Sequence, residues 1–142
     1  MDSMMRRVLM FVMVVTAAVC LTGCGGKNSD RQTGTTDSRI LGQWVAQQIV
    51  YSGQTQTCPG TIDANSSTVS CTNDVTGFTS DGKYSVGATT DDFFFDGTTL
   101  ILYNRSGNAA SFTVVFDAST NVMTWTFSQN GQDAVLTINR QP

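Results

Sequence analysis

From Ile40 to the end of the chain, apolar and polar residues alternate, and short turn motifs interrupt the alternation. In the segment 110–117, for example, Phe112, Val114 and Phe116 fall on one side of an extended strand. Successive side chains of a strand point to opposite faces, so this pattern predicts strands with one buried and one wetter face. No convincing helical period competes with it. The alternation therefore predicts an all-β fold.

Asp-Gly or Asn-Gly pairs at 81–82, 96–97 and 130–131 supply the positive φ angles that tight hairpins need. Turn motifs recur about every ten to fifteen residues, which is the rhythm of an antiparallel meander. So many short strands usually close into a small barrel, and the alternative is a β-sandwich. We expect eight or nine strands, at 41–51, 67–71, 75–80, 83–88, 92–95, 98–104, 110–117, 121–129 and 132–140.

The charged residues are few, at 13% of the chain, and the net charge is −3. Nucleic-acid binding needs clustered Lys and Arg, so we do not expect a nucleic-acid partner. The chain contains no histidine, and its acidic residues are all aspartate, so common general bases are missing. We therefore expect no enzymatic activity and no cofactor.

The amino terminus has the three zones of a signal peptide. Arg6 and Arg7 precede an apolar run at 8–19. As a helix this run would be about 18 Å long, well short of a ~30 Å hydrocarbon core, so it suits a signal peptide better than a membrane span. Small Gly23 precedes Cys24, whereas branched Val19 precedes Cys20. Cleavage is therefore expected at Cys24, and an uncleaved anchor is the alternative.

The motif Leu-Thr-Gly-Cys at 21–24 resembles the lipobox of bacterial lipoproteins. The resemblance implies cleavage between Gly23 and Cys24 and a lipid, including palmitate-type acyl chains, on Cys24. The residue after Cys24 is Gly rather than Asp, which favours the outer membrane over the inner membrane. We expect a signal peptide at 1–23, a flexible tether at 24–39, of which residues 25–38 include no apolar side chain, and a folded domain at 40–142.

The other two cysteines, Cys58 and Cys71, flank a polar insert. Export places them in an oxidising compartment, so we expect a disulfide, which would stabilise the fold by roughly 3 kcal/mol in the chain-entropy model. Free thiols are the alternative. A metal site is not expected, since two cysteines without histidine do not complete a zinc site.

Gly42, Gln43 and Trp44 open the first expected strand. This Gly-x-Trp motif, followed by Phe-x-x-Asp-Gly-x-Tyr at 78–84, resembles the pattern of lipocalins and of short bacterial lipocalin-like lipoproteins. The resemblance implies a barrel closed at one end by Trp44, with a late basic residue, Arg140, packed on it. Strand adjacency suggests the same pair, because the first and last strands of a closed antiparallel barrel are neighbours. An arginine over an indole is favourable by about 0.5–2 kcal/mol. A solvated terminal arginine is the alternative.

Two functions remain. The first is an envelope lipoprotein, anchored in the membrane through its lipid, whose non-catalytic barrel binds a small apolar ligand. The second is an interaction or inhibitor module that contacts an unidentified protein and has no small ligand. An apolar cavity above ~300 Å³ would favour the first, and a fully packed interior with an exposed aromatic patch would favour the second. Asp91, Asp92 and Asp96 could in principle bind calcium, but their spacing favours turn and edge-strand roles.

Overall fold

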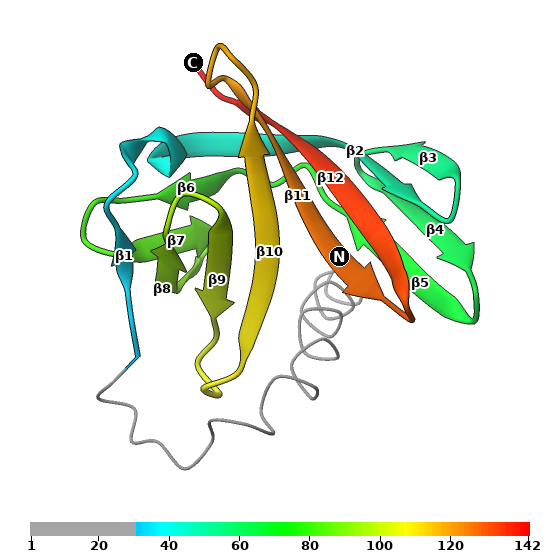
Figure 1. Ribbon diagram of the computed structural model, residues 1–142, viewed down its shortest axis with the longest axis horizontal. Helices are drawn as coiled ribbons and strands as arrows, with labels where there is room; N and C mark the ends of the chain where they lie inside the picture. The colour runs from blue at the N-terminus through cyan, green and yellow to red at the C-terminus, as the bar shows by residue number, and fades with distance from the viewer. Residues whose placement is uncertain (1–30) are drawn as a thin grey trace.

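Eight strands close into an antiparallel barrel in the computed structural model, which describes residues 31–142 (Figure 1). Around the barrel the order is β2, β6, β7, β8, β9, β10, β11 and β12, and β12 pairs back with β2. This order is that of a small lipocalin-like barrel, as the alternation predicted, and the β-sandwich alternative is excluded. The strands are β2 (Gly42–Tyr51), β6 (Thr76–Phe78), β7 (Lys83–Val86), β8 (Thr89–Phe95), β9 (Thr99–Tyr103), β10 (Ala109–Phe116), β11 (Val122–Gln129) and β12 (Gln132–Arg140).

Each of these eight strands lies within or overlaps one of the nine expected segments. The remaining expected segment, 67–71, is strand β5 (Ser67–Cys71), which lies outside the barrel. The sequence did not predict three strands: β1 (Gly34–Thr35), β3 (Gln54–Thr57) and β4 (Gly60–Ala64). Strand β3 contains no apolar residue, so it carries no alternation to detect. It forms because its backbone pairs with the free edge of the long strand β2.

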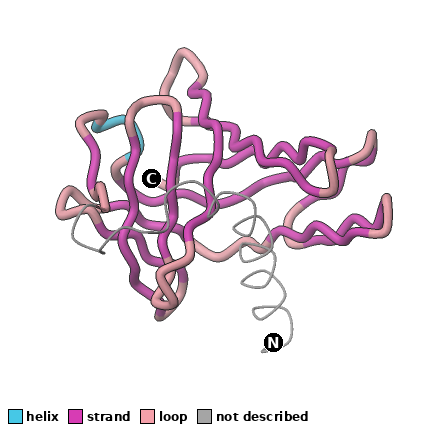
Figure 2. The backbone as a smooth tube through the Cα atoms, turned by 60° about the horizontal axis from the view of Figure 1, so that its bottom comes forward, coloured by secondary structure: helices cyan, strands magenta, loops and turns pink. Residues whose placement is uncertain are grey.

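Strands β3, β4 and β5 project from one side of the barrel, as Figures 1 and 2 show. We call residues 48–71, which include these strands, the wing. Strand β3 continues the sheet from β2, and β4 and β5 form a separate hairpin. The hairpin covers the ends of β2 and β12 that extend beyond the barrel. This arrangement buries a small second core made of Ile49, Tyr51, Ile62, Val69, Cys71 and Ala134.

The folded part begins earlier than the boundary at residue 40 that the sequence suggested. Gly34 and Thr35 pair in parallel with Phe94 and Phe95 of β8. This edge of β8 is available because β7 pairs with β8 only as far as Asp92. The Thr35 hydroxyl also donates to the Phe95 carbonyl at 2.8 Å. Residues 34–39 therefore belong to the fold, since backbone pairing needs no apolar side chain.

A single 3-10 turn, η3 (Ser38–Ile40), connects β1 to β2 across one end of the barrel. Asp37 caps this turn, because its carboxylate accepts from the backbone N–H of Arg39 at 3.1 Å. The Arg39 side chain donates to the same carboxylate, which keeps the pKa of Asp37 below its ordinary value despite some burial. The turn places Ile40, which is fully buried, inside the barrel.

Candidate functional site

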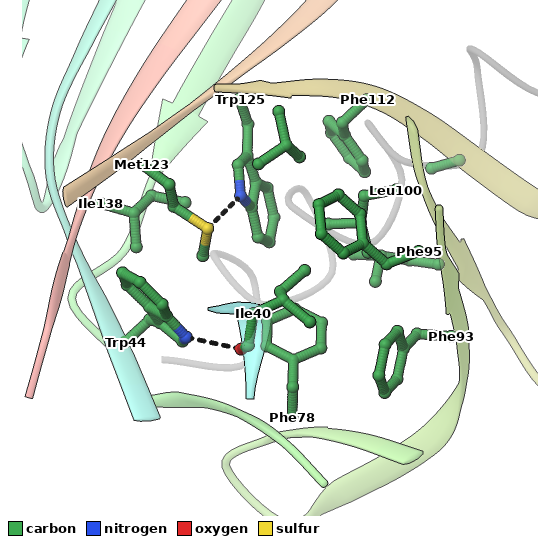
Figure 3. Close-up of a cluster of buried hydrophobic side chains, with 13 residues drawn as sticks. Ile40, Trp44, Phe78, Phe93, Phe95, Leu100, Phe112, Met123, Trp125 and Ile138 are labelled. Carbon is green, nitrogen blue, oxygen red and sulfur yellow. Dashed lines mark hydrogen bonds between the residues drawn. The ribbon is translucent and has the colours of Figure 1, made fainter. Parts of the chain in front are cut away.

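The barrel interior is filled with side chains (Figure 3). Phe78 of β6 contacts Trp125 of β11 across the barrel, with ring centroids 6.2 Å apart. Phe78 also meets Phe93 at 4.9 Å, and Phe112 meets Trp125 at 5.1 Å. Rings from strands that are not neighbours thus touch each other along the axis. Such an interior resembles a packed protein core rather than the hollow interior of a carrier barrel.

Trp44 and Arg140 lie together at one end, which we call the closed end. The Arg140 guanidinium lies 4.2 Å from the centre of the Trp44 ring, and the two residues are register partners on β2 and β12. The Trp44 indole N–H donates to the Ile40 carbonyl at 2.9 Å. The guanidinium donates to the carbonyls of Leu41 and Arg39, each at 2.6 Å. The structure therefore brings together the pair named from the sequence, in a structural role.

Gly42 explains why the motif before Trp44 requires glycine. Its φ is +118°, and a Cβ atom there would stand 2.8 Å from Nη1 of Arg140. A larger residue would therefore be strained and would displace the guanidinium from Trp44. The Gly-x-Trp motif thus serves the packing of the closed end.

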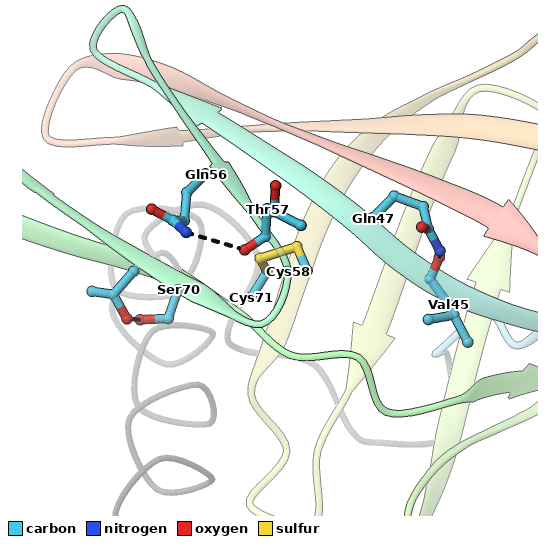
Figure 4. The surroundings of a disulfide bond; sticks show 8 residues. Val45, Gln47, Gln56, Thr57, Cys58, Ser70 and Cys71 are labelled. Carbon is cyan, nitrogen blue, oxygen red and sulfur yellow. Dashed lines mark hydrogen bonds between the residues drawn. A yellow bond between two sulfur atoms is a disulfide. The ribbon is translucent and has the colours of Figure 1, made fainter.

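Cys58 and Cys71 form the expected disulfide, with Cα atoms 5.4 Å apart (Figure 4). The bond joins the segment between β3 and β4 to the end of β5. The Cys58 backbone N–H donates to the Gln47 carbonyl of β2 at 2.9 Å. The disulfide therefore fixes the β4–β5 hairpin beside β2, and it has a structural role.

The opposite end of the barrel carries a polar depression of about 440 Å³, which we call the lip. The lip consists of Arg31, Asp91 and the turn Asn104–Gly107, which includes Arg105. The Asn104 side chain orders this turn, because its oxygen accepts from the backbone N–H groups of Ser106 and Asn108, each at 3.0 Å. Its lining is polar, so the depression does not fit the small apolar ligand.

Ion pairs connect the lip to the outer surface of β7–β9. Asp92 accepts from both Lys83 and Arg31, and these contacts, with Lys83 first, hold the pKa of Asp92 below its ordinary value. The Arg31 guanidinium also lies 4.4 Å from the centre of the Tyr103 ring. These two contacts attach the chain at Arg31 to the barrel wall.

Tyr84 lies beneath this cluster, and its hydroxyl donates to the Tyr103 carbonyl at 2.9 Å. Burial, and secondarily the charges of Asp91 and Asp92, raise the pKa of Tyr84 to about 12. The phenol therefore stays protonated at neutral pH, so it holds β7 to β9 as a donor and offers no base.

The three clustered aspartates do not converge on a common point. Asp91 lines the lip, Asp92 faces the two cations outside, and Asp96 accepts from the backbone N–H groups of Thr98 and Thr99 in a turn. Within residues 31–142 no group of three acidic, histidine or cysteine side chains is placed to hold a metal ion.

A patch without charged side chains lies on the outer side of β10, β11, β12, β2 and β3, and Asp133 of β12 borders it. Thr113, Thr126, Val135, Val50 and Thr55 stand opposite one another on successive strands. A parallel row holds Val115, and Val115 is 62% exposed. We call the two rows the Thr/Val face; its members are Gln48, Val50, Thr55, Thr57, Thr113, Val115, Thr124, Thr126, Val135 and Thr137.

Sequence reasoning missed the lip and the Thr/Val face. The outward positions of the alternating strands at 110–140 already show threonine and valine in place of charges, and that signal could have indicated the face. Arg31 and Arg105 lie far apart in the sequence, so only the fold brings them to one end.

The lipidation and cleavage positions, Cys24 and Gly23, lie outside the described residues. In the part of the chain that is described, no helix has the length and apolar character to cross a membrane. The comparisons with known proteins add no relative: no protein-family model, no curated protein and no solved structure matches this chain.

Proposed function

We propose that this protein is a cell-envelope lipoprotein, anchored through a lipid on Cys24, whose barrel is a non-catalytic interaction module for another envelope protein. The anchor is supported by the lipobox-like motif at 21–24 and by the short apolar run before it. Gly25 after the cysteine favours the outer membrane.

The packed interior supports the interaction module over the ligand-binding function, and the exposed large apolar side chains of the described residues are Val75 and Val115 rather than aromatic ones. Trp44, Phe93, Phe95 and Leu100 are completely buried by other side chains, so an apolar ligand would have to displace part of the core. Removing large core side chains costs several kcal/mol, which exceeds what a weakly bound small ligand would return. The interaction module is therefore the better-supported function.

The Thr/Val face is the surface that best suits a protein partner. Interface cores are depleted in charged residues, because desolvating a charge without a partner is costly. The ten members of the face lie on five strands and none of them is charged, and the exposed carboxylate of Asp133 lies at its border. Val115 supplies an exposed apolar side chain on it, and the threonine hydroxyls supply hydrogen-bonding groups. The occupant we propose is an uncharged surface of another envelope protein whose polar groups can form hydrogen bonds with the threonine hydroxyls.

Site-specific photo-crosslinking in the native host tests this function. A crosslinking amino acid at Val115 should give one discrete adduct, whereas the same amino acid at Thr90, an exposed strand position on β8, should give none. Thr126→Lys should abolish the Val115 adduct, because it places a charge in the face, and the matched variant Thr90→Lys should leave it unchanged.

Equal adducts at both positions, or no adduct at Val115, would overturn the proposed surface. The ligand-binding alternative has its own readout, native mass spectrometry of protein purified from the host. A stoichiometric lipophile bound to the intact barrel would overturn the interaction module in favour of a carrier.

A further inference from the structure

The described chain begins at Arg31, which is attached to the lip. Arg31 contacts Asp92 and the Tyr103 ring, and Gly34 is already paired with β8. Cys24 precedes Arg31 by seven residues. Seven residues reach at most about 25 Å when fully extended. If Cys24 carries the proposed lipid, Arg31 lies within about that distance of the bilayer surface.

The length of the segment between Cys24 and Arg31 limits how far the domain can stand from the bilayer. The distribution of charge on the domain can set which side faces the bilayer. The described residues contain five basic side chains, and three of them, Arg31, Lys83 and Arg105, lie on or beside β7–β9 and the lip. Lys83 follows the Asp81 turn and pairs with Asp92, so these two charges offset each other. The lip itself holds Arg31 and Arg105 against Asp91, which leaves a net charge of +1.

The closed end has the opposite balance. Its turns carry four aspartates, Asp37, Asp81, Asp96 and Asp117, against Arg39 and Arg140. Figure 1 shows the start of β1 and the loop between β9 and β10 at one end of the barrel, and η3 and the C-terminus at the other. An anionic bilayer would attract the lip and repel the closed end.

We propose that the lip is a membrane-facing surface, so that the lipid-anchored barrel sits on an anionic bilayer with Arg31 and Arg105 toward the phosphate headgroups. The closed end then points away from the membrane. The Thr/Val face, whose strands run from one end to the other, stands upright and stays open to a partner. This inference rests on the lipid anchor of the proposed function.

A depth measurement on the lipidated full-length protein in vesicles tests the orientation. Ser106→Cys at the lip and Ala118→Cys at the closed end are exposed positions in the turns at the two ends of β10, and each receives the same fluorophore. The eight residues of β10 separate these ends by about 26 Å. Energy transfer to a short-range acceptor on the lipid headgroups should be about twofold or more higher from residue 106 in vesicles containing phosphatidylglycerol.

A charge variant tests whether electrostatic attraction to the bilayer causes this orientation. Arg105→Ser should reduce the difference between the two positions in anionic vesicles, and high salt should reduce it as well. Flotation of the protein with the vesicles is measured in the same samples. Equal transfer from both positions, or stronger transfer from residue 118, in protein that does float would overturn the orientation and leave the anchor intact. Failure to float would overturn the anchor, and the orientation with it.

Discussion

The barrel and the wing are both built from short antiparallel strands, but different forces hold them together. The barrel buries a cluster of thirteen side chains, and rings from opposite strands meet inside it. The wing buries a cluster of six, and a disulfide joins two of its segments. Apolar burial contributes about 25 cal/mol per Å², so a small patch gives little stability to three polar strands. The disulfide between Cys58 and Cys71 therefore lies in the region with the smaller hydrophobic core.

The largest effect should come from the barrel core. Trp44→Ala removes a fully buried indole that also supports Arg140, so we expect a loss of about 3–5 kcal/mol in the free energy of unfolding. Guanidinium denaturation followed by tryptophan fluorescence measures it, with Trp125 as the remaining probe.

Val115→Ala is the control, because this side chain is 62% exposed and its loss should change stability by at most about 0.5 kcal/mol. If Trp44→Ala and Val115→Ala had similar free energies of unfolding, the stability of the barrel would not depend on the packing at its closed end.

Removing the disulfide should have a smaller and more local effect. Cys58→Ala combined with Cys71→Ala opens a loop with a sequence separation of 13 residues, which corresponds to a loss of roughly 3 kcal/mol at most. Hydrogen exchange should show lost protection in residues 48–71 and retained protection in β8–β10. A uniform loss of protection across the barrel would contradict the separation of the two regions.

The smallest effect on stability should come from lowering the pH. Hydrogen bonds hold the pKa of Asp117 below its ordinary value of 3.8, first from the Ser119 hydroxyl and then from backbone N–H groups. Backbone N–H groups of Thr99 and Thr98 do the same for Asp96. A lowered folded-state pKa stabilises the fold above the unfolded value, and that contribution is lost as the pH falls through the folded-state pKa.

We therefore expect the denaturation midpoint to fall modestly between about pH 5 and about pH 3. Asp117→Asn, measured over the same pH range, should flatten the dependence. Both carboxylates lie in turns of the barrel, so hydrogen exchange at acid pH should increase first in residues 96–99 and 117–122 rather than in the wing. A midpoint that rises on acidification would contradict this assignment.

Local pattern predicted most of the barrel. In β10 the apolar positions named from the sequence, Phe112, Val114 and Phe116, all face the interior, because side-chain alternation follows directly from extended backbone geometry. Hairpins between consecutive strands are also local, since Gly82, Gly97 and Gly131 adopt the positive φ that their turn motifs predicted. Strands β1 and β3 escaped prediction because backbone pairing, rather than an apolar pattern, forms them. Strand β4 escaped because Ile62 and Ala64 are too few to show an alternation, although Ile62 is buried.

The sequence by itself determined an all-β meander, and it contains a lipobox-like motif at 21–24. It predicted the disulfide between Cys58 and Cys71, with free thiols as the alternative, and the structure contains the bond. Only the tertiary structure decided that the barrel is packed, because that depends on whether rings from distant strands, such as Phe78 and Trp125, meet on the axis. The lip likewise required the fold, since Arg31 and Arg105 come together only after the sheet has closed. The alternation of apolar and polar side chains depends only on residues that are neighbours in the sequence. The packing of the barrel interior and the placement of charges depend on which strands the closed barrel brings together.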